Sequence, residues 1–591
     1  MWKITSFCLF VCVCAAWATE DTRESRLVHI AQGPVRGIPY ATIPTGPNRY
    51  KAPLPPPTWM HPLEAINKKI ACPQQSILYG NFPNLTIQED CLIANVFVPD
   101  TEGEKLPVLV NIHGGGFQGG SSEWVMLSKM VTDNNFILVT ANYRLGIHGF
   151  LCLGTEDIPG NAGMKDQVAA LRWVKNNIAS FGGNPDDVTI QGGSAGSAAV
   201  DLLMLSKSAE GLFNKVIPES GGSIVQWTIQ SDPLENAKKI AKDLNFTNVD
   251  DIYAIEDFFK TASFDQLLSI SYLYNPDSTL GLSPCVERAT GGEVFLDRSP
   301  VDILKSGNYR KVPVLYGFAN MEGLMRVDLF DDWKDKMNKK FSDFLPADLK
   351  FASKKQKEEV AKKVKEFYFG DEPVGEKTIL SYIDYFSDVL FAYSMLRSVK
   401  YHVEAGHDEI YLYEYSFVDD NTPYIPHTNL KGANHCAQSI AVFGGLPGDM
   451  DPNTKTKEFL EMSSILNVIW GNFVKTGKPI PEGSSLPPWP AVGEGWSPHM
   501  SLGNEISLRG PLLERRVRFW DDIYSKHYRD PIPPPKPTPR RTDSDAPDFV
   551  LLLKVLCITA MVMDNWTYTS WTYNWIYIYL VVDLLSRRSS R

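Results

Sequence analysis

The sequence has little cysteine, and its cysteines and histidines lack the spacing of a metal site. Nine cysteines occur in 591 residues without any C-x-x-C pair, and the ten histidines show no H-x-x-x-H spacing. So few cysteines exclude a small disulfide-rich scaffold, and the missing ligand patterns argue against bound zinc. We therefore expect no metal and no other cofactor.

The chain also lacks the basic excess that is typical of nucleic-acid-binding proteins. It carries 58 Lys and Arg against 69 Asp and Glu, a formal net charge of −11. This balance argues against nucleic acid as the main partner. A hydrophobic content of 43% and a charged content of 21% are typical of a globular protein.

The two ends of the chain differ in composition from the rest. Residues 1–18 combine Lys3, a short apolar run and Ala16-Trp17-Ala18, the pattern of a signal peptide cut after Ala18. Residues 531–547 are a proline-rich linker, and residues 548–591 form an apolar and aromatic tail. Neither apolar run of the tail reaches the roughly 18 residues of a clean membrane helix. We expect a secreted protein, with membrane attachment through the tail as the alternative.

Because an exported protein can be glycosylated and can form disulfides, two N-x-T sequons and the remaining cysteines are informative. The sequons predict glycosylation at Asn84 and Asn245. Three cysteines leave with the signal peptide, and spacing alone does not pair the other six. These are Cys72, Cys91, Cys152, Cys285, Cys436 and Cys557.

Between the two ends, short apolar runs alternate with helical patterns. Such an alternation predicts an α/β fold with a large, mostly parallel central sheet and helices on both faces. The predicted strands cover 107–114, 136–143, 186–193, 311–320 and 409–417, and the predicted helices cover 163–181, 195–206 and 354–368.

Ser194 lies in a G-x-S-x-G frame between a predicted strand and a predicted helix. A serine hydroxyl is a poor nucleophile, so it needs a base, and the base needs an orienting acid. A tight strand-to-helix turn also strains the backbone and requires small residues such as Gly192 and Gly196 on either side. The frame predicts that Ser194 is a nucleophile.

A glycine-rich run, NIHGGGFQGG (111–120), begins at the end of the first predicted strand. Glycines let backbone N–H groups approach a developing oxyanion without obstruction by side chains. In this type of fold the N–H of the residue after the nucleophile completes the oxyanion hole. The candidates are therefore Gly115, Gly116 and Ala195.

The acid and the base should follow the serine in that order. Glu322 comes just after the predicted strand 311–320, and Asp328 is a weaker alternative. His427 and His435 both follow the strand 409–417, and spacing does not decide between them.

Taken together, several segments between about residues 28 and 530 resemble the carboxylesterase/cholinesterase family of the α/β-hydrolase fold, and look most like insect carboxylesterases. The resemblance implies a catalytic domain over 19–530 and a small-molecule ester substrate. It also implies that Ser194 forms the acyl-enzyme, Glu322 orients the base and His435 is the base, and that Cys72 pairs with Cys91. The segments are RGIPYA (36–41), EDCLIANVFVP (89–99), HGGGF (113–117), NYRLGIHGFL (142–151), the run 160–196, NMEG (320–323) and GANH (432–435).

Two positions beside the predicted triad depart from the family pattern. The family usually has Glu or Gln where this chain has Gly193, and often an acid where it has Gln438; a serine matching Ser220 completes this polar surround. Since nearby anions favour imidazolium, we expect a lower pKa for His435 and activity extending to lower pH. Glu219, where the family often has Gln, would oppose this effect.

The same resemblance narrows the substrate. Cholinesterases hold a quaternary ammonium group on a tryptophan inside the first disulfide loop, whereas residues 72–91 contain only Tyr79 and Phe82 as aromatic residues. Gly193 also departs from the glutamine typical of juvenile-hormone esterases. We therefore expect a lipophilic carboxylic ester. The alternative is a non-catalytic, neuroligin-like adhesion protein, because fold alone does not establish catalysis.

Overall fold

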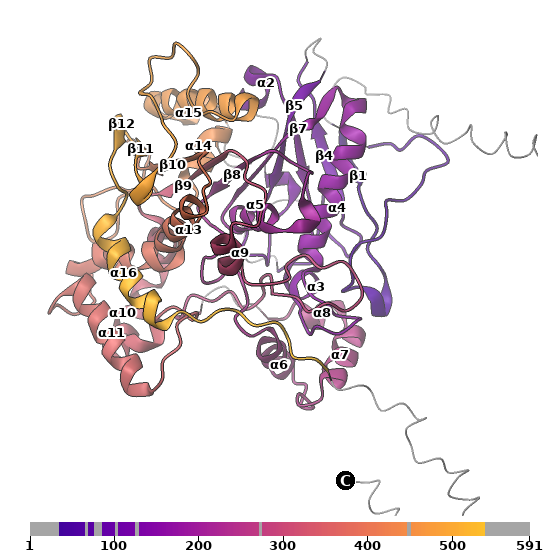
Figure 1. Cartoon of the computed structure of the whole chain (residues 1–591), viewed down its shortest axis with the longest axis horizontal. Coiled ribbons are helices and arrows are strands. Elements are labelled where there is room, and N and C mark those ends of the chain that lie inside the picture. Colours follow the sequence, from indigo (N-terminus) through magenta and orange to yellow (C-terminus); the bar gives the residue numbers. More distant parts are fainter. Residues whose placement is uncertain are drawn as a thin grey trace, which may run out of the picture. The chain divides into compact units, whose positions relative to one another are not determined.

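A ten-stranded sheet runs through the centre of the computed structural model (Figure 1), which describes residues 35–65, 69–75, 85–100, 105–124, 129–270, 275–445 and 451–537. The strand order is β1-β4-β6-β5-β7-β8-β9-β10-β11-β12. All neighbours from β6 to β11 run parallel, whereas β1–β4, β4–β6 and β11–β12 are antiparallel. The predicted large, mostly parallel sheet is confirmed.

The observed strands include every one that the sequence predicts. Their counterparts are β5, β6, β7, β9 and β10, with ends that differ by a few residues. The strands span Val35–Pro39 (β1), Ile93–Phe97 (β4), Leu106–Ile112 (β5), Ile137–Ala141 (β6), Gly183–Gly193 (β7), Lys215–Glu219 (β8), Val314–Ala319 (β9), Ile410–Tyr415 (β10), His499–Leu502 (β11) and Ile506–Arg509 (β12). A separate pair is formed by Ile70–Ala71 (β2) and Thr86–Ile87 (β3).

Helices cover both faces of the sheet, because alternate residues of each strand point to opposite sides. In β5, Val108 and Val110 pack into one hydrophobic cluster and Leu109 into another. The first cluster includes residues of α4 (Ala162–Asn177), α5 (Ala195–Leu205), α9 (Pro300–Ser306) and α13 (Tyr393–Glu404). The second includes residues of α2 (Lys129–Asn134), α14 (Ala437–Phe443) and α15 (Lys457–Thr476).

Two further groups of helices lie beyond the sheet layers (Figure 1). One group consists of α3 (Gly146–Phe150), α6 (Pro233–Asp243), α7 (Ile252–Thr261) and α8 (Phe264–Leu267). The other consists of α10 (Phe330–Lys339), α11 (Lys354–Phe369), α12 (Ile379–Ser387) and α16 (Glu514–His527). The predicted helix over 354–368 is α11, and its Val364 is buried.

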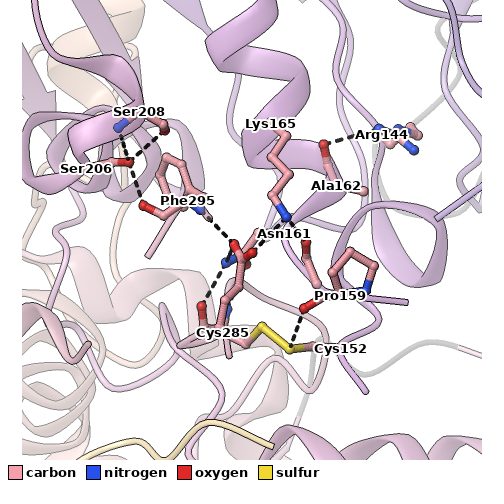
Figure 2. Close-up of polar contacts among 12 residues, drawn as sticks. Arg144, Cys152, Pro159, Asn161, Ala162, Lys165, Ser206, Ser208, Cys285 and Phe295 are labelled. Carbon is pink, nitrogen blue, oxygen red and sulfur yellow. Dashed lines mark hydrogen bonds and ion pairs between the residues drawn. A yellow bond between two sulfur atoms is a disulfide. The ribbon is translucent and has the colours of Figure 1, made fainter. Parts of the chain in front are cut away.

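A buried ion pair joins α4 to the segment that follows Cys285 (Figure 2). Lys165 Nζ donates to Glu287 Oε2 at 2.7 Å, and Asn161 Nδ2 donates to Glu287 Oε1 at 2.7 Å. A disulfide between Cys152 and Cys285 lies beside these contacts, a pairing that the sequence left open. The second disulfide, Cys72–Cys91, is the pairing that the family resemblance implies.

Replacement of Lys165 by methionine is expected to lower the free energy of unfolding by about 3–5 kcal/mol, because it leaves the Glu287 carboxylate buried without a cation. The double variant Lys165→Met/Glu287→Gln removes both charges and keeps an acceptor for Asn161, so it should regain most of the loss. Urea unfolding measures both values. Wild-type stability in the single variant would contradict the expectation.

The predicted signal peptide, Asn84 and the tail 548–591 lie outside the described residues. Asn245 is exposed at the surface. Contacts divide the chain after Lys536, within the predicted linker. Among the described residues, no helix combines the length and the apolar character needed to cross a membrane.

Candidate active site

Ser194 lies on a sharp turn between β7 and α5. Its backbone has φ 59° and ψ −124°, a conformation that a residue with a side chain rarely adopts. A Cβ at position 192 would lie 2.3 Å from the carbonyl of Gly196, and one at position 196 would lie 2.1 Å from Ile112 O. Both flanking positions of the G-x-S-x-G frame therefore require glycine, as the sequence indicates.

The glycine-rich loop lies directly beside this turn. A Cβ at position 114 would come within 3.1 Å of Ser194 Cβ. Gly115 and Gly116 follow with φ of 110° and 61°, values that favour glycine. Gln74 exchanges two hydrogen bonds with the backbone of Gly120, of 2.8 and 2.9 Å. The loop is thus held at the turn by a residue next to the Cys72–Cys91 disulfide.

Glu322 and His435 form a direct contact. The Glu322 carboxylate is fully buried at the start of the 3₁₀ helix η7 (Glu322–Leu329), just after β9. Its Oε2 contacts Nδ1 of His435, and its Oε1 accepts a 2.8 Å hydrogen bond from Ala319 N. A carboxylate at Nδ1 fixes the ring and leaves Nε2 for a proton transfer.

A chain of polar groups continues from the carboxylate to α14. Ser220 Oγ donates to Glu322 Oε1, and Gln438 Nε2 donates to Ser220 Oγ at 2.7 Å. Because an amide donates where a carboxylate could only accept, Gln438 directs the Ser220 hydroxyl toward Glu322. The two sequence-predicted neighbours, Ser220 and Gln438, therefore act on the acid.

The pKa of His435 is raised by its neighbours. Burial lowers it, but the neighbouring Cys436 sulfur and the Glu322 carboxylate outweigh burial and raise the pKa to about 10. This shift refers to a free imidazole, so the expected lowering relative to family members with acids at positions 193 and 438 stays a prediction.

The alternative residues considered from the sequence lie elsewhere. Asp328 is exposed on η7. His427 is partly exposed, and its Nδ1 lies 3.8 Å from Glu376 Oε2 rather than at Glu322. The geometry thus favours Glu322 and His435 over both alternatives.

An aromatic run leads from the base to the glycine-rich loop. The Phe391 ring stacks on His435 at 4.4 Å between centroids, Trp227 packs against Phe391 at 5.8 Å, and Phe117 lies 6.3 Å from Trp227. Phe391 belongs to a π-helical segment, Asp388–Ala392, an irregularity often found at functional sites. The surroundings of the base are therefore apolar on this side.

Residues 34–520 match the profile of the Carboxylesterase family. The chain belongs to the carboxylesterase family. Similar proteins are carboxylesterase 5A of Canis lupus familiaris (32% identity over 84% of this chain and 87% of the relative) and juvenile hormone esterase of Tribolium castaneum (30%, 78% and 82%). Family membership makes the chain a carboxylic ester hydrolase, for which the implied substrate is a small-molecule ester.

A solved structure supports the same assignment for the fold. The crystal structure of juvenile hormone esterase from Manduca sexta, with OTFP covalently attached, is similar with a TM-score of 0.74. Identity is 29%, and the match covers 83% of this chain and 95% of that chain. This carboxylesterase therefore has the α/β-hydrolase fold.

Glu219, beside the Ser194 turn, is a buried acid outside the proposed triad. Its backbone oxygen accepts from Ser194 N at 2.9 Å, and its Oε2 accepts from Gln191 Nε2 at 2.7 Å. Burial raises the pKa of its carboxyl from 4.5 to about 7. Glu219 is therefore not a fixed negative charge near neutral pH.

The raised pKa of Glu219 predicts a loss of stability as the pH rises. The folded state favours the protonated acid. The stabilisation is therefore fully present below the pKa of Glu219 in the unfolded chain and is lost as the pH rises through its folded pKa of about 7. The loss in the free energy of unfolding is on the order of 3 kcal/mol. In Glu219→Gln this loss of stability with rising pH should disappear. Urea unfolding at pH 5 and pH 8 measures the free energy of unfolding of the wild type and of the variant. An equal change between the two pH values in both proteins would contradict the assignment.

The sequence missed three residues of the site: Gln74, Phe391 and Cys436. Gln74 and Phe391 act through contacts with distant segments, which no local pattern reveals. Cys436 had a signal, because it directly follows the predicted base.

Proposed function

We propose that this carboxylesterase hydrolyses a lipophilic carboxylic ester through an acyl-enzyme on Ser194, with Glu322 and His435 as acid and base. The single observation that carries the proposal is the contact of buried Glu322 with Nδ1 of His435, whose neighbour Cys436 lies beside Gly193 of the Ser194 turn. Each group then has the role that acyl transfer requires: nucleophile, base and orienting acid.

The proposed reaction runs in two halves. Nε2 of His435 takes the proton of Ser194 Oγ as the oxygen attacks the ester carbonyl, and it returns that proton to the leaving alcohol. The backbone N–H groups of Gly115, Gly116 and Ala195 stabilise the oxyanion. Water, activated by the same imidazole, then releases the acid from Ser194.

Two observations support a lipophilic substrate. The buried aromatic run of Phe117, Trp227 and Phe391 makes the surroundings of the base apolar. Similar proteins also include one named "Pyrethroid hydrolase Ces2a" from Mus musculus, 30% identical over 82% of this chain. Secretion is supported by the N-terminal pattern and by two disulfides.

The test uses the full chain expressed in insect cells, with nitrophenyl acetate, butyrate and decanoate and acetylthiocholine as substrates. We expect active protein in the medium that prefers the longer acyl chains over the choline ester. Lack of turnover for every ester would contradict the proposal and support an adhesion role. Activity found only in the membrane fraction would contradict secretion.

Introduction of glutamate at position 193 is expected to move the acidic limb of the pH profile of kcat/KM to higher pH. The added anion favours the imidazolium form of His435, so more base is protonated at a given pH. Gly193→Gln is the matched control, with similar size and no charge. An unchanged limb in Gly193→Glu, relative to that control, would contradict the expectation.

A further inference from the structure

Cys436, the residue after the proposed base, lies against its imidazole. Its Sγ is 3.6 Å from Nε2 of His435, the nitrogen that the proposed mechanism assigns to Ser194. The other four cysteines of the described part form two disulfides, so Cys436 is the free thiol of that part. The thiol and the serine hydroxyl therefore compete for one nitrogen.

The space that the sulfur occupies is open because position 193 carries no side chain. A Cβ there would lie 3.4 Å from Cys436 Sγ and 3.3 Å from Ser439 Oγ. A longer side chain at this position would have to pass between these two atoms. Because Gly193 has no side chain, the Cys436 thiol has room between the backbone of residue 193 and the His435 imidazole.

Charged and ionisable groups face this pair from three neighbouring elements. They are Glu322 of η7, Glu219 at the end of β8 and Tyr413 of β10. Burial is the main cause that raises the pKa of Tyr413, and electrostatic interactions with Glu219, Cys436 and Glu322 raise it further. The apolar Phe391 ring stacks on His435 from the π-helical segment.

We propose that Cys436 is a positioning residue of this esterase, which holds Nε2 of the resting base through its sulfur and makes ester hydrolysis sensitive to covalent modification of the thiol. This inference rests on the proposed function. While the sulfur shares its proton with Nε2, Ser194 lacks its base. Ser194 becomes active when the sulfur releases the imidazole.

The first test is the pH profile of kcat/KM for nitrophenyl butyrate in the full chain. Removal of the sulfur by Cys436→Ala should move the acidic limb to lower pH by about one unit. At a pH below the wild-type limb, this shift corresponds to a roughly tenfold gain in kcat/KM. Cys436→Gly is the matched variant, because the φ of 60° at this position strains alanine but not glycine. Both should shift the limb equally, although their stabilities differ. A purely structural role would change stability without moving the limb, and that result would overturn the proposal.

The second test is alkylation with N-ethylmaleimide, followed by peptide mass mapping. The sulfur bonds to one alkene carbon, the π bond breaks, and the thiol proton ends on the other alkene carbon. We expect a loss of activity of at least tenfold in the wild type and in Cys557→Ser, whereas Cys436→Ala resists. Full modification of Cys436 with intact activity would overturn the proposal. An unmodified wild type without turnover or labelling at Ser194 would instead contradict the proposed function.

Discussion

Replacement of Ser194 by alanine is expected to lower kcat for nitrophenyl butyrate by about a millionfold, because the loss of the nucleophile of a serine–histidine–acid triad has an effect of this size. The strained turn and its glycine neighbours remain, so the fold should persist. The rate is measured with the full chain at the wild-type pH optimum.

Ser197→Ala is the matched control for this variant. Ser197 lies one turn further along α5, and its buried hydroxyl donates to Gly221 O at 2.6 Å. Its loss should cost about 1 kcal/mol of stability and leave the chemistry intact. Residual activity above one hundredth of wild type in Ser194→Ala would contradict the role of Ser194.

Glu322→Gln is expected to lower kcat by about ten thousandfold, because an amide at Nδ1 no longer stabilises the imidazolium and can select the wrong tautomer of His435. The buried hydrogen bond from Ala319 N can still be accepted by the amide oxygen, so the fold should tolerate the change. Stopped assays over long times measure the small residual rate.

Asp328→Asn provides the control for Glu322→Gln. Asp328 follows on the same 3₁₀ helix, loses the same charge and is exposed. Near-wild-type activity is expected for this variant. A larger loss in Asp328→Asn than in Glu322→Gln would reverse the assignment of the acid.

Local sequence patterns predicted the elements that frame the turn at Ser194. The continuous apolar runs of β5 and β6 are buried on both faces, and such strands are marked by composition alone. The glycines at 192 and 196 are required by backbone contacts within the same turn, so a short motif carries that information. For the acid and base the residues left alternatives open, and the family resemblance selected Glu322 and His435.

Other features depend on contacts between distant segments and were therefore missed. The Cys152–Cys285 pairing joins residues 133 positions apart, which spacing does not reveal. Strand β8, with the sequence KVIPE, contains lysine, proline and glutamate that mask its apolar residues. The contact of the Cys436 sulfur with His435 was missed as well, although the two residues are adjacent in the sequence.

The most direct test of the central claim, hydrolysis through an acyl-enzyme on Ser194, is the site of reaction with a fluorophosphonate probe. The full chain is treated with the probe, digested and mapped by mass spectrometry, beside Ser194→Ala. We predict one equivalent of label on the peptide that contains Ser194, and none on the variant. Label on another residue, or an active esterase that takes up no label, would contradict the mechanism.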